Sequence, residues 1–354
     1  MIFRQLFDNT SSTYTYLLGC ESSGAAVVID PVFERIDRDA ALVHELGLTL
    51  RYVVDTHVHA DHVTAAWLFK ARLGATIVAS GRYGLDAVDH PVDHSDVLAF
   101  GHCALEVRAT PGHTNGCITL VTSDQRRAFT GDCLLIRGAG RTDFQAGDSH
   151  DMWRSIREQI FSLPDSCLLY PGHDYAGRTV STVAEERAYN PRIGGEAREE
   201  DFVGYMDNLG LAHPKLLEIA VPANMNCGRP EDDQLPGEIT WAPVTLTFAG
   251  IPELEPDWVA QHRNDLFVLD VRQPDEFGGE LGHVENATLI PLHELRERLY
   301  EVPKDRPIVT VCQSGKRSAM AAMILLDAGW QEVANVAGGL IQWSRIGLPG
   351  LAEH

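Results

Sequence analysis

The sequence lacks the features that mark several classes of protein. No apolar run approaches the ~18 residues that a membrane-spanning helix needs, and the opening MIFRQLFDNTSSTYTYLL has no basic stretch followed by a long apolar core. We therefore expect neither a membrane span nor a signal peptide. The seven cysteines are odd in number, scattered and without a C-x-x-C pair. This argues against a disulfide framework and favours a reduced, cytoplasmic setting.

Positive charge is also scarce. The chain has 29 Lys and Arg against 50 Asp and Glu, a formal net charge of −21 and a pI near 5.0. Because nucleic acid and anionic membranes attract proteins through a basic face, we expect neither as a partner. An anionic substrate would have to be captured by local arginines or by a metal. The 354 residues, 44% hydrophobic and 22% charged, suit a globular protein of two domains.

The pattern of apolar residues, glycine and proline divides the chain into two α/β domains. In the first two-thirds, short apolar strands such as RYVVD alternate with helices. We expect one helix to be closed by Gly74, one to be capped by Ser149, and one to begin with a capping box from Thr182. A stretch rich in Pro, Gly and acid then predicts a linker, after which a strand–helix–strand pattern returns. The predicted divisions are residues 1–228, 229–251 and 252–354.

A cluster of potential metal ligands follows the predicted strands of the first domain. The segment THVHADH supplies four of them, and the dipeptides Gly-His, Gly-Asp and Gly-His later in the chain supply three more. Strand ends on one edge of a sheet converge in space, and imidazole and carboxylate are good ligands for zinc or iron. We therefore predict a metal site, with one or two ions both open from spacing alone. The donors are His57, His59, Asp61, His62, His113, Asp132 and His173.

Residues 1–225 resemble the metallo-β-lactamase superfold, which implies an αββα sandwich. The flanking stretches LIRGAGRTDFQAG, YPGHDYAGRTVSTVAEERAYNPR and VPANMNCG look like the persulfide dioxygenases of the ethylmalonic-encephalopathy type. That resemblance implies one Fe(II) in the N-terminal domain, held by His57, His113 and Asp132, with open positions for O2 and a sulfur donor. The residues around the metal that would not bind it directly are His59, Asp61, His62, His173 and Asp174.

The same resemblance implies glutathione persulfide as the substrate, oxidised with O2 to sulfite and glutathione. The two carboxylates of glutathione need cationic or amide partners, and guanidinium binds carboxylate bidentately. The candidates for this contact are Arg141, Tyr175 and Arg192, followed by Arg137 and Arg178. Met225 and Cys227 lie in VPANMNCG and would either line the sulfur pocket or pack in the core.

The second domain carries the segment VTVCQSGKRSAMAAMILL, which predicts a strand, a loop and a helix. Cys312 stands where the strand ends. Inward-facing loop amides, the positive end of the helix and two basic side chains would all lower the pKa of its thiol. We therefore predict a reactive thiolate at Cys312. The loop residues expected to act with it are Ser314, Gly315, Lys316 and Arg317.

This loop resembles the rhodanese active-site pattern C-x-x-G-x-R-S. The stretches LDVRQPDEF, GHVENATLIPL and GGLIQW also look like rhodanese, and the resemblance covers residues 252–354. It implies a small α/β domain with a parallel sheet and a Cys312 persulfide that moves sulfane sulfur between thiosulfate and glutathione. We expect Asp270 and Arg272 to be structural, pairing to hold strand to loop.

Together the two resemblances imply a persulfide dioxygenase–rhodanese fusion protein of sulfide metabolism, in either direction of sulfur flux. One alternative is a two-metal thioester hydrolase of the glyoxalase II kind with an accessory sulfurtransferase domain. Another is a non-catalytic sulfur carrier. The sequence leaves the oligomeric state open, a homo-oligomer included.

Overall fold

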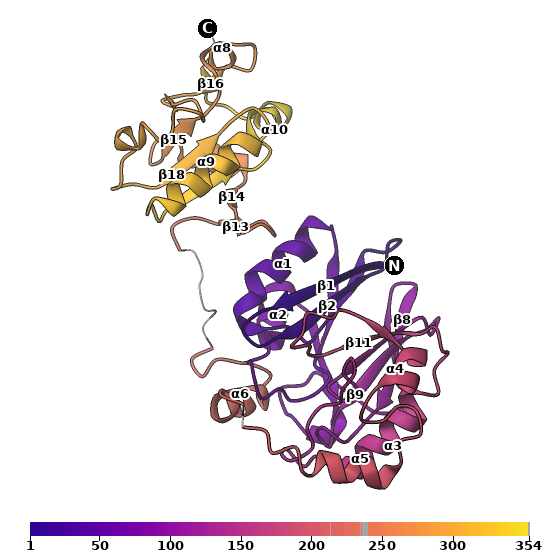
Figure 1. Ribbon diagram of the computed structural model, residues 1–354. Helices are drawn as coiled ribbons and strands as arrows, with labels where there is room; N and C mark the ends of the chain where they lie inside the picture. Colours follow the sequence, from indigo (N-terminus) through magenta and orange to yellow (C-terminus); the bar gives the residue numbers. More distant parts are fainter. Residues whose placement is uncertain (213, 234, 236–239, 353–354) are drawn as a thin grey trace. The chain divides into compact units, whose positions relative to one another are not determined.

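The computed structural model describes residues 1–212, 214–233, 235 and 240–352. Contacts divide the chain into two units, Met1–Leu235 and Pro236–His354 (Figure 1). Residues 234 and 236–239 of the predicted linker, and the last two residues of the predicted second domain, lie outside the described residues. The predicted divisions at 228 and 252 stay predictions.

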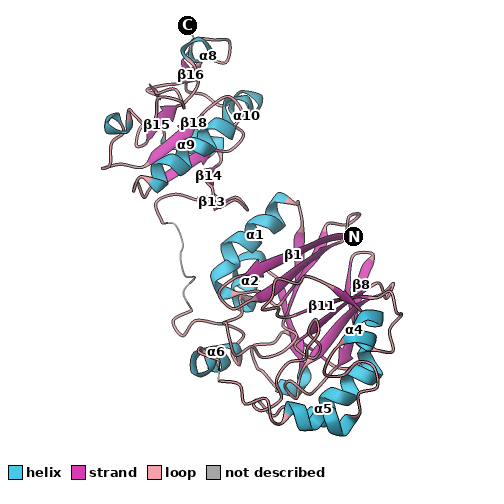
Figure 2. Ribbon diagram, in the orientation of Figure 1, coloured by secondary structure: helices cyan, strands magenta, loops and turns pink. Residues whose placement is uncertain are grey.

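The first unit is an αββα sandwich of two six-stranded sheets. Figure 2 shows α1 and α2 on one outer face and α4 and α5 on the other. The first sheet has the order β1-β2-β3-β4-β5-β6: β1 (Ile2–Asp8), β2 (Thr13–Gly19), β3 (Ala25–Ile29), β4 (Thr49–Val54), β5 (Thr76–Ser80) and β6 (His90–Val92). The second has the order β12-β11-β10-β9-β8-β7: β7 (Val97–Phe100), β8 (Cys103–Ala109), β9 (Ile118–Thr122), β10 (Arg127–Gly131), β11 (Leu168–Pro171) and β12 (Ser181–Thr182). The helices are α1 (Ile36–Glu45), α2 (Ala66–Leu73), α3 (Ser149–Arg154), α4 (Val183–Tyr189), α5 (Glu199–Met206) and α6 (Leu217–Asn224).

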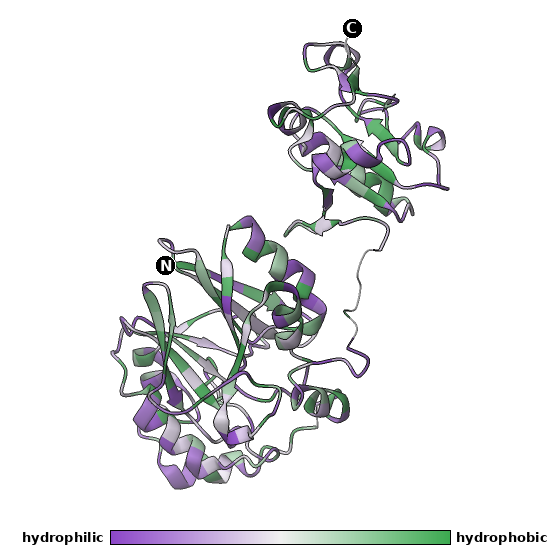
Figure 3. Cartoon of the chain, turned by 180° about the vertical axis from the view of Figure 1, so that it is seen from behind, coloured by the Kyte–Doolittle hydropathy of each residue, from purple (hydrophilic) through white to green (hydrophobic). Residues whose placement is uncertain are grey.

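Alternation along the strands builds the two inner layers of the core. Val54 of β4 faces the second sheet, whereas its neighbour Val53 packs under α1 and α2. This is the two-residue period of a strand that is covered on both faces. A third cluster fills the space between the second sheet and α3, α4 and α5. Figure 3 shows the hydrophobic residues concentrated along these strands.

Several local predictions can be compared directly with the helix ends. Gly74 closes α2 in the left-handed region (φ 69°), and the Thr182 side chain caps α4 by accepting the Glu185 amide, so the predicted closing glycine and the predicted cap are confirmed. The second half of the predicted capping box differs, because the Glu185 carboxylate accepts from Ser181 and pairs with Arg137. The prediction of Ser149 as a cap is wrong. Asp148 caps α3, because its extended backbone lets its carboxylate accept the Asp151 amide at 2.8 Å.

The second unit is an α/β domain around one mostly parallel sheet, with an apolar cluster on each face. The sheet has the order β13-β14-β19-β18-β15-β17, with only β13 antiparallel to its neighbour. Its strands are β13 (Thr245–Leu246), β14 (Pro252–Leu254), β15 (Phe267–Asp270), β17 (Thr288–Leu289), β18 (Ile308–Val311) and β19 (Val333–Val336); β16 (His283–Val284) and β20 (Leu351–Ala352) pair separately. The helices are α7 (Pro256–His262), α8 (Pro274–Phe277), α9 (Lys316–Asp327) and α10 (Gly339–Arg345). Within the described part of the chain, no helix has the length and apolar character that crossing a bilayer requires.

Candidate metal centre and sulfur-transfer loop

The predicted metal ligands follow strands whose ends meet between the two sheets. His57 comes after β4, His113 after β8, Asp132 after β10 and His173 after β11. The turn before Asp132 needs glycine: Gly131 has φ 49°, and a Cβ there would lie 2.6 Å from the Thr56 hydroxyl. Side chains far apart in sequence are thereby brought into one buried cluster.

Three of the predicted ligands form a compact triad. The Nε2 atom of His57 lies 4.0 Å, and that of His113 3.8 Å, from Oδ2 of Asp132. One ligand atom from each residue lies within 4.8 Å of the others, and all three residues are buried. Two imidazoles and one carboxylate on one side of an ion leave its other side open. The donor set therefore fits a single metal ion with vacant positions.

Hydrogen bonds fix which ring nitrogen of His57 and of His113 carries hydrogen. Nδ1 of His113 donates to the Arg141 carbonyl at 2.7 Å. Nδ1 of His57 lies 3.0 Å from the Thr56 hydroxyl, whose own proton is donated to Asp30. Since the carbonyl and the committed hydroxyl can only accept, each Nδ1 carries hydrogen, and each Nε2 is the nitrogen left to bind an ion. Burial also lowers the pKa of His57 well below its usual value, so this ring is neutral.

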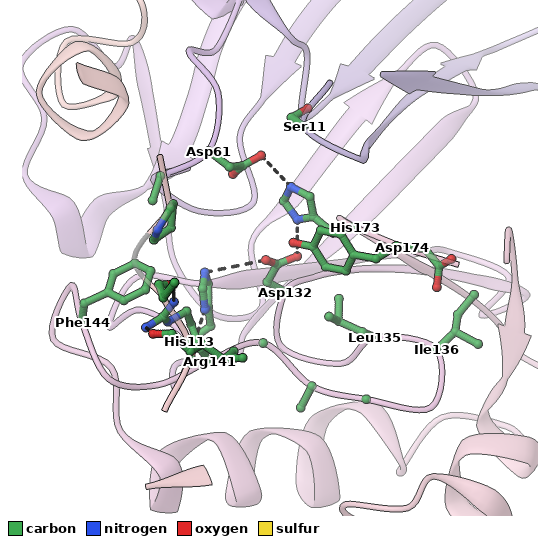
Figure 4. A pocket seen from close by; sticks show the side chains of 18 of the residues that line it. Ser11, Asp61, His113, Asp132, Leu135, Ile136, Arg141, Phe144, His173 and Asp174 are labelled. Atoms are coloured by element: carbon green, nitrogen blue, oxygen red, sulfur yellow. Dashed lines mark hydrogen bonds and ion pairs between the residues drawn. The ribbon is translucent and has the colours of Figure 1, made fainter. Parts of the chain in front are cut away.

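His173 lies between two carboxylates rather than in the triad. Its Nδ1 is 2.7 Å from Oδ1 of Asp132 and its Nε2 is 2.9 Å from Oδ2 of Asp61 (Figure 4). Burial disfavours the charged ring, but the two carboxylates outweigh it and raise the pKa of His173 well above its usual value. His173 thereby holds one Asp132 oxygen and leaves the other facing His57 and His113.

The remaining predicted donors form a second cluster beside the first. His59, Asp61, His62 and His173 also bring one ligand atom each within 4.8 Å. Nδ1 of His59 and Nε2 of His62 are buried without a hydrogen-bond partner among the described residues. Unpaired buried nitrogen is unfavourable unless something binds it. The geometry thus accommodates one ion in the triad and leaves donors for another.

Asp174 has a different neighbourhood from the one expected. Its carboxylate accepts the amides of Ala176 at 2.8 Å and Arg178 at 2.7 Å and pairs with the Arg178 side chain. These contacts place it in the turn that follows His173 rather than against a ligand imidazole. It shapes the loop that carries Tyr175.

Asn224, which the sequence analysis did not single out, holds the ligand loop in place. Its Oδ1 accepts the Thr64 amide at 2.8 Å, and its Nδ2 donates to the carbonyls of His59 and His62 at 2.9 and 2.8 Å. Asn224 is buried and ends α6. Its place inside VPANMNCG was the only signal in the sequence, because nothing local shows that α6 returns to the metal loop.

A cavity of about 990 Å³ opens onto Asp132, His113 and His173. Apolar and aromatic side chains, among them Phe144 and Leu135, form part of its wall (Figure 4). All five predicted substrate contacts with cationic or phenolic groups line it, and so does Lys215, which was not predicted. These residues are Arg137, Tyr175, Arg178, Arg141, Arg192 and Lys215.

The predicted contact residues differ in how free their side chains are. Arg141 already pairs with Asp143 at 2.6 Å and donates to two backbone carbonyls. One guanidinium nitrogen of Arg192 donates to the Ala139 carbonyl at 2.6 Å. Met225 is exposed and Cys227 is buried in the cluster under the first sheet. Neither of these two lines the cavity, and the position of Cys227 is that of a core residue.

The predicted thiolate loop joins β18 to α9. Cys312 is buried, and the Ser318 hydroxyl lies 3.2 Å from its sulfur. Gly315 turns the chain into the helix with φ 86°, in the left-handed region. Arg317 is held by both carboxylate oxygens of Glu276 at 2.6 Å, so it does not point freely into the loop. Ser318 and Glu276 were not predicted.

Four other residues predicted in or near this loop are Ser314, Lys316, Asp270 and Arg272. Ser314 and Lys316 are exposed. The buried pair of Asp270 and Arg272, with 2.8 Å between carboxylate and guanidinium, confirms the predicted structural role. Arg272 also donates to the Gly282 carbonyl at 2.7 Å. The ion pair therefore ties β15 to the loop after α8.

Comparison with known proteins agrees with a metal-ligand cluster in the first unit and a Cys312 loop in the second. The metallo-beta-lactamase superfamily model matches residues 8–173, and the rhodanese-like domain model matches residues 255–346. The protein named mitochondrial persulfide dioxygenase ETHE1 from Mus musculus is 53% identical over 229 residues, which cover 64% of this chain and 89% of the mouse protein. The chain belongs to the persulfide dioxygenase family.

Two solved structures extend the comparison to this family's fold. The crystal structure of ETHE1 from Myxococcus xanthus is 51% identical with a TM-score of 0.62, and the match covers 64% of this chain and all of that one. A metallo-beta-lactamase from Staphylococcus aureus subsp. aureus COL is 25% identical with a TM-score of 0.61, covering 95% of this chain and 98% of that one. The predicted fold class of both units is confirmed.

Proposed function

We propose that the first unit oxidises glutathione persulfide with O2 to sulfite and glutathione at one Fe(II). We further propose that the second unit moves sulfane sulfur between thiosulfate and glutathione through a Cys312 persulfide. The observation that carries the first part is the open triad of two imidazoles and one carboxylate, in a chain of which 229 residues are 53% identical to a protein named persulfide dioxygenase. The cytoplasmic setting and the direction of sulfur flux stay predictions.

The donor set fits Fe(II) through His57, His113 and Asp132. When bound, this metal would supply vacant coordination positions for O2 and sulfur, together with reducing electrons that zinc lacks. The chain's own task is to keep these positions open and correctly aimed. His173 does so by holding one Asp132 oxygen at 2.7 Å, which fixes the carboxylate plane. The Arg141 carbonyl does the same for the His113 ring.

The cavity wall supplies what an anionic tripeptide needs. Arg192 and Lys215 line it and offer cationic groups to the substrate carboxylates, and Tyr175 offers a hydroxyl. The apolar part of the wall near Phe144 would exclude water from the sulfur end. Most N–H groups of Arg141 already donate to Asp143 and to two backbone carbonyls. We therefore propose that the Arg141 side chain forms part of the cavity wall.

The second unit positions a thiol at a helix N-terminus. Cys312 lies in the loop before α9, and the first-turn amides of this twelve-residue helix are free at the end that follows the loop. The proposed step is attack of the Cys312 thiolate on the sulfane sulfur of thiosulfate, which breaks the S–S bond and releases sulfite. A glutathione thiolate then takes the same sulfur and returns Cys312 to a thiolate. Ser318 is placed to donate to the cysteine sulfur.

A two-metal thioester hydrolase remains the second candidate. The observation that favours it is the pair of unpartnered nitrogens on His59 and His62. Against it, both nitrogens of His173 are engaged by Asp61 and Asp132. In a hydrolase of that kind a second ion bound through Nε2 of His173 would have to displace the Asp61 contact.

Product analysis separates the two candidates. Protein purified anaerobically with iron is given glutathione persulfide and O2 in one assay and a glutathione thioester in another. We expect sulfite in proportion to O2 consumed and no thioester cleavage above background. Thioester cleavage without O2 uptake would replace the dioxygenase proposal with the hydrolase.

A further inference from the structure

One side chain outside the predicted ligands joins the two loops that carry the histidines of the triad. Tyr83 ends a short 3-10 helix that follows β5. Its hydroxyl accepts the Val58 amide at 3.2 Å and is hydrogen-bonded to the Thr114 hydroxyl at 2.5 Å. Val58 comes directly after His57 in the sequence, and Thr114 comes directly after His113. A single hydroxyl group is therefore bonded to both ligand loops.

The ring of Tyr83 is also fitted to the loop that carries His113. A Cβ atom on Gly116 would lie 2.5 Å from this ring, well inside the ~3.5 Å at which carbon atoms touch. Glycine thus lets the ring lie directly against the backbone of the loop. Thr114 is fully buried and Val58 is buried, so water does not compete for either hydrogen bond, and loss of the hydroxyl would leave a buried amide without its acceptor.

The other contacts of the two imidazoles do not hold them in this way. The hydrogen bonds on Nδ1 orient each ring separately, because their partners differ. The rings of His57 and His113 lie with centroids 4.9 Å apart and planes at 86°, and both Nε2 atoms have to reach one ion. The Ile118 amide, which donates to the Thr56 carbonyl at 2.9 Å, holds the residue before His57. Tyr83 holds the residue after it.

We propose that Tyr83 is a positioning residue of the metal centre, whose hydroxyl holds His57 and His113 at the separation and angle that one ion requires. The inference rests on the proposed function only in taking the triad as the metal site. Tyr83 is not one of the described residues that line the large cavity. Its influence reaches the ion through the ligands, so a substitution should change metal affinity and coordination geometry.

Titration of the metal-free, full-length protein with Co(II) alone tests this. Tyr83→Phe keeps the ring against Gly116 and removes only the hydroxyl. We expect the dissociation constant for Co(II) to rise by about tenfold, as is typical when a group that supports a ligand is lost, and the visible absorption of bound Co(II) to shift. Wild-type affinity and absorption in Tyr83→Phe would overturn the proposal.

The titration uses neither O2 nor a persulfide, so a negative result for Tyr83→Phe leaves the dioxygenase proposal standing. A wild-type protein that binds no Co(II) would instead contradict the metal site, and this inference with it.

A control variant separates positioning from general stability. Thr122→Val removes a buried hydroxyl that is hydrogen-bonded to the backbone N–H and carbonyl of Arg127, at the end of β9 away from the His113 loop. It should lower the urea midpoint and leave Co(II) affinity unchanged. Equal losses of affinity in Thr122→Val and Tyr83→Phe would show an effect of stability alone and would overturn the proposal.

Thr114 tests the same hydrogen bond from its other partner, and does so even if Tyr83→Phe does not fold. Thr114→Val removes the hydroxyl and should weaken Co(II) binding, whereas Thr114→Ser keeps the hydroxyl and should bind nearly as the wild type does. Since Thr114→Val and Tyr83→Phe break one shared bond, the double variant should lose less affinity than the two single losses combined. Wild-type affinity in Thr114→Val, or fully additive losses in the double variant, would refute the proposed link.

Discussion

Asn224→Ala should weaken metal binding although it replaces none of the predicted metal ligands. The substitution removes three buried hydrogen bonds and leaves the Thr64 amide and the carbonyls of His59 and His62 without their partner. At roughly 1 kcal/mol for each such bond, the free energy of unfolding of the first unit should fall by about 3 kcal/mol. This is a large share of the 5–15 kcal/mol that holds a typical domain folded. The loop after β4 should also bind metal less tightly.

Urea unfolding of the full chain and metal analysis of the purified variant measure these two effects. Asn208→Ala is the matched control, because Asn208 Nδ2 makes one exposed hydrogen bond to the Gly204 carbonyl at 2.7 Å. Its unfolding free energy should stay within about 0.5 kcal/mol of the wild type, with full metal content. If Asn224→Ala unfolds and binds metal like Asn208→Ala, the loop does not depend on this side chain and the reasoning fails.

Three further predictions concern the two proposed sites. Cys312→Ser should abolish sulfur transfer from thiosulfate and leave O2 uptake unchanged; transfer that survives would mean another nucleophile. Asp132→Ala should lose metal and O2 uptake while sulfur transfer continues, and a loss of both activities with normal circular dichroism would show that the units depend on each other. Glu276→Gln should reduce the free energy of unfolding at neutral pH. The hydrogen bond from Arg317 lowers the pKa of Glu276 from 4.5 to about 2. The ion pair therefore stabilises the folded state at pH values above the unfolded pKa, and this stabilisation is lost as the pH falls through 2. Urea midpoints at pH 6 and pH 2 should differ by less in the variant than in the wild type.

The two folds and most donor positions could be predicted because their signals are local. A strand that ends in Gly-His or Gly-Asp predicts a potential metal ligand from two neighbouring residues. The loop from Cys312 to Arg317 is likewise one continuous segment of the sequence. The confirmed pair of Asp270 and Arg272 is separated by one residue. Each of these inferences needed only the neighbouring sequence and the rule that strand ends converge.

The missed residues depend on contacts between distant segments. Asn224 reaches the loop at His59 across 165 positions, and Glu276 reaches Arg317 across 41. Lys215 enters the cavity wall only because the chain after α5 returns over the site. The wrong cap at Ser149 has a different cause. Asp148 is an equally good capping residue, and the sequence alone does not show which of the two adopts extended backbone.

Location of the bound metal tests the central claim most directly. Anaerobically purified protein, analysed for metal content and by anomalous scattering from crystals, should contain one iron per chain. We predict that this iron lies between His57, His113 and Asp132, with His59 and His62 not bonded to it. Two ions per chain, with the ring nitrogens of His59 and His62 bonded directly to metal, would contradict the account.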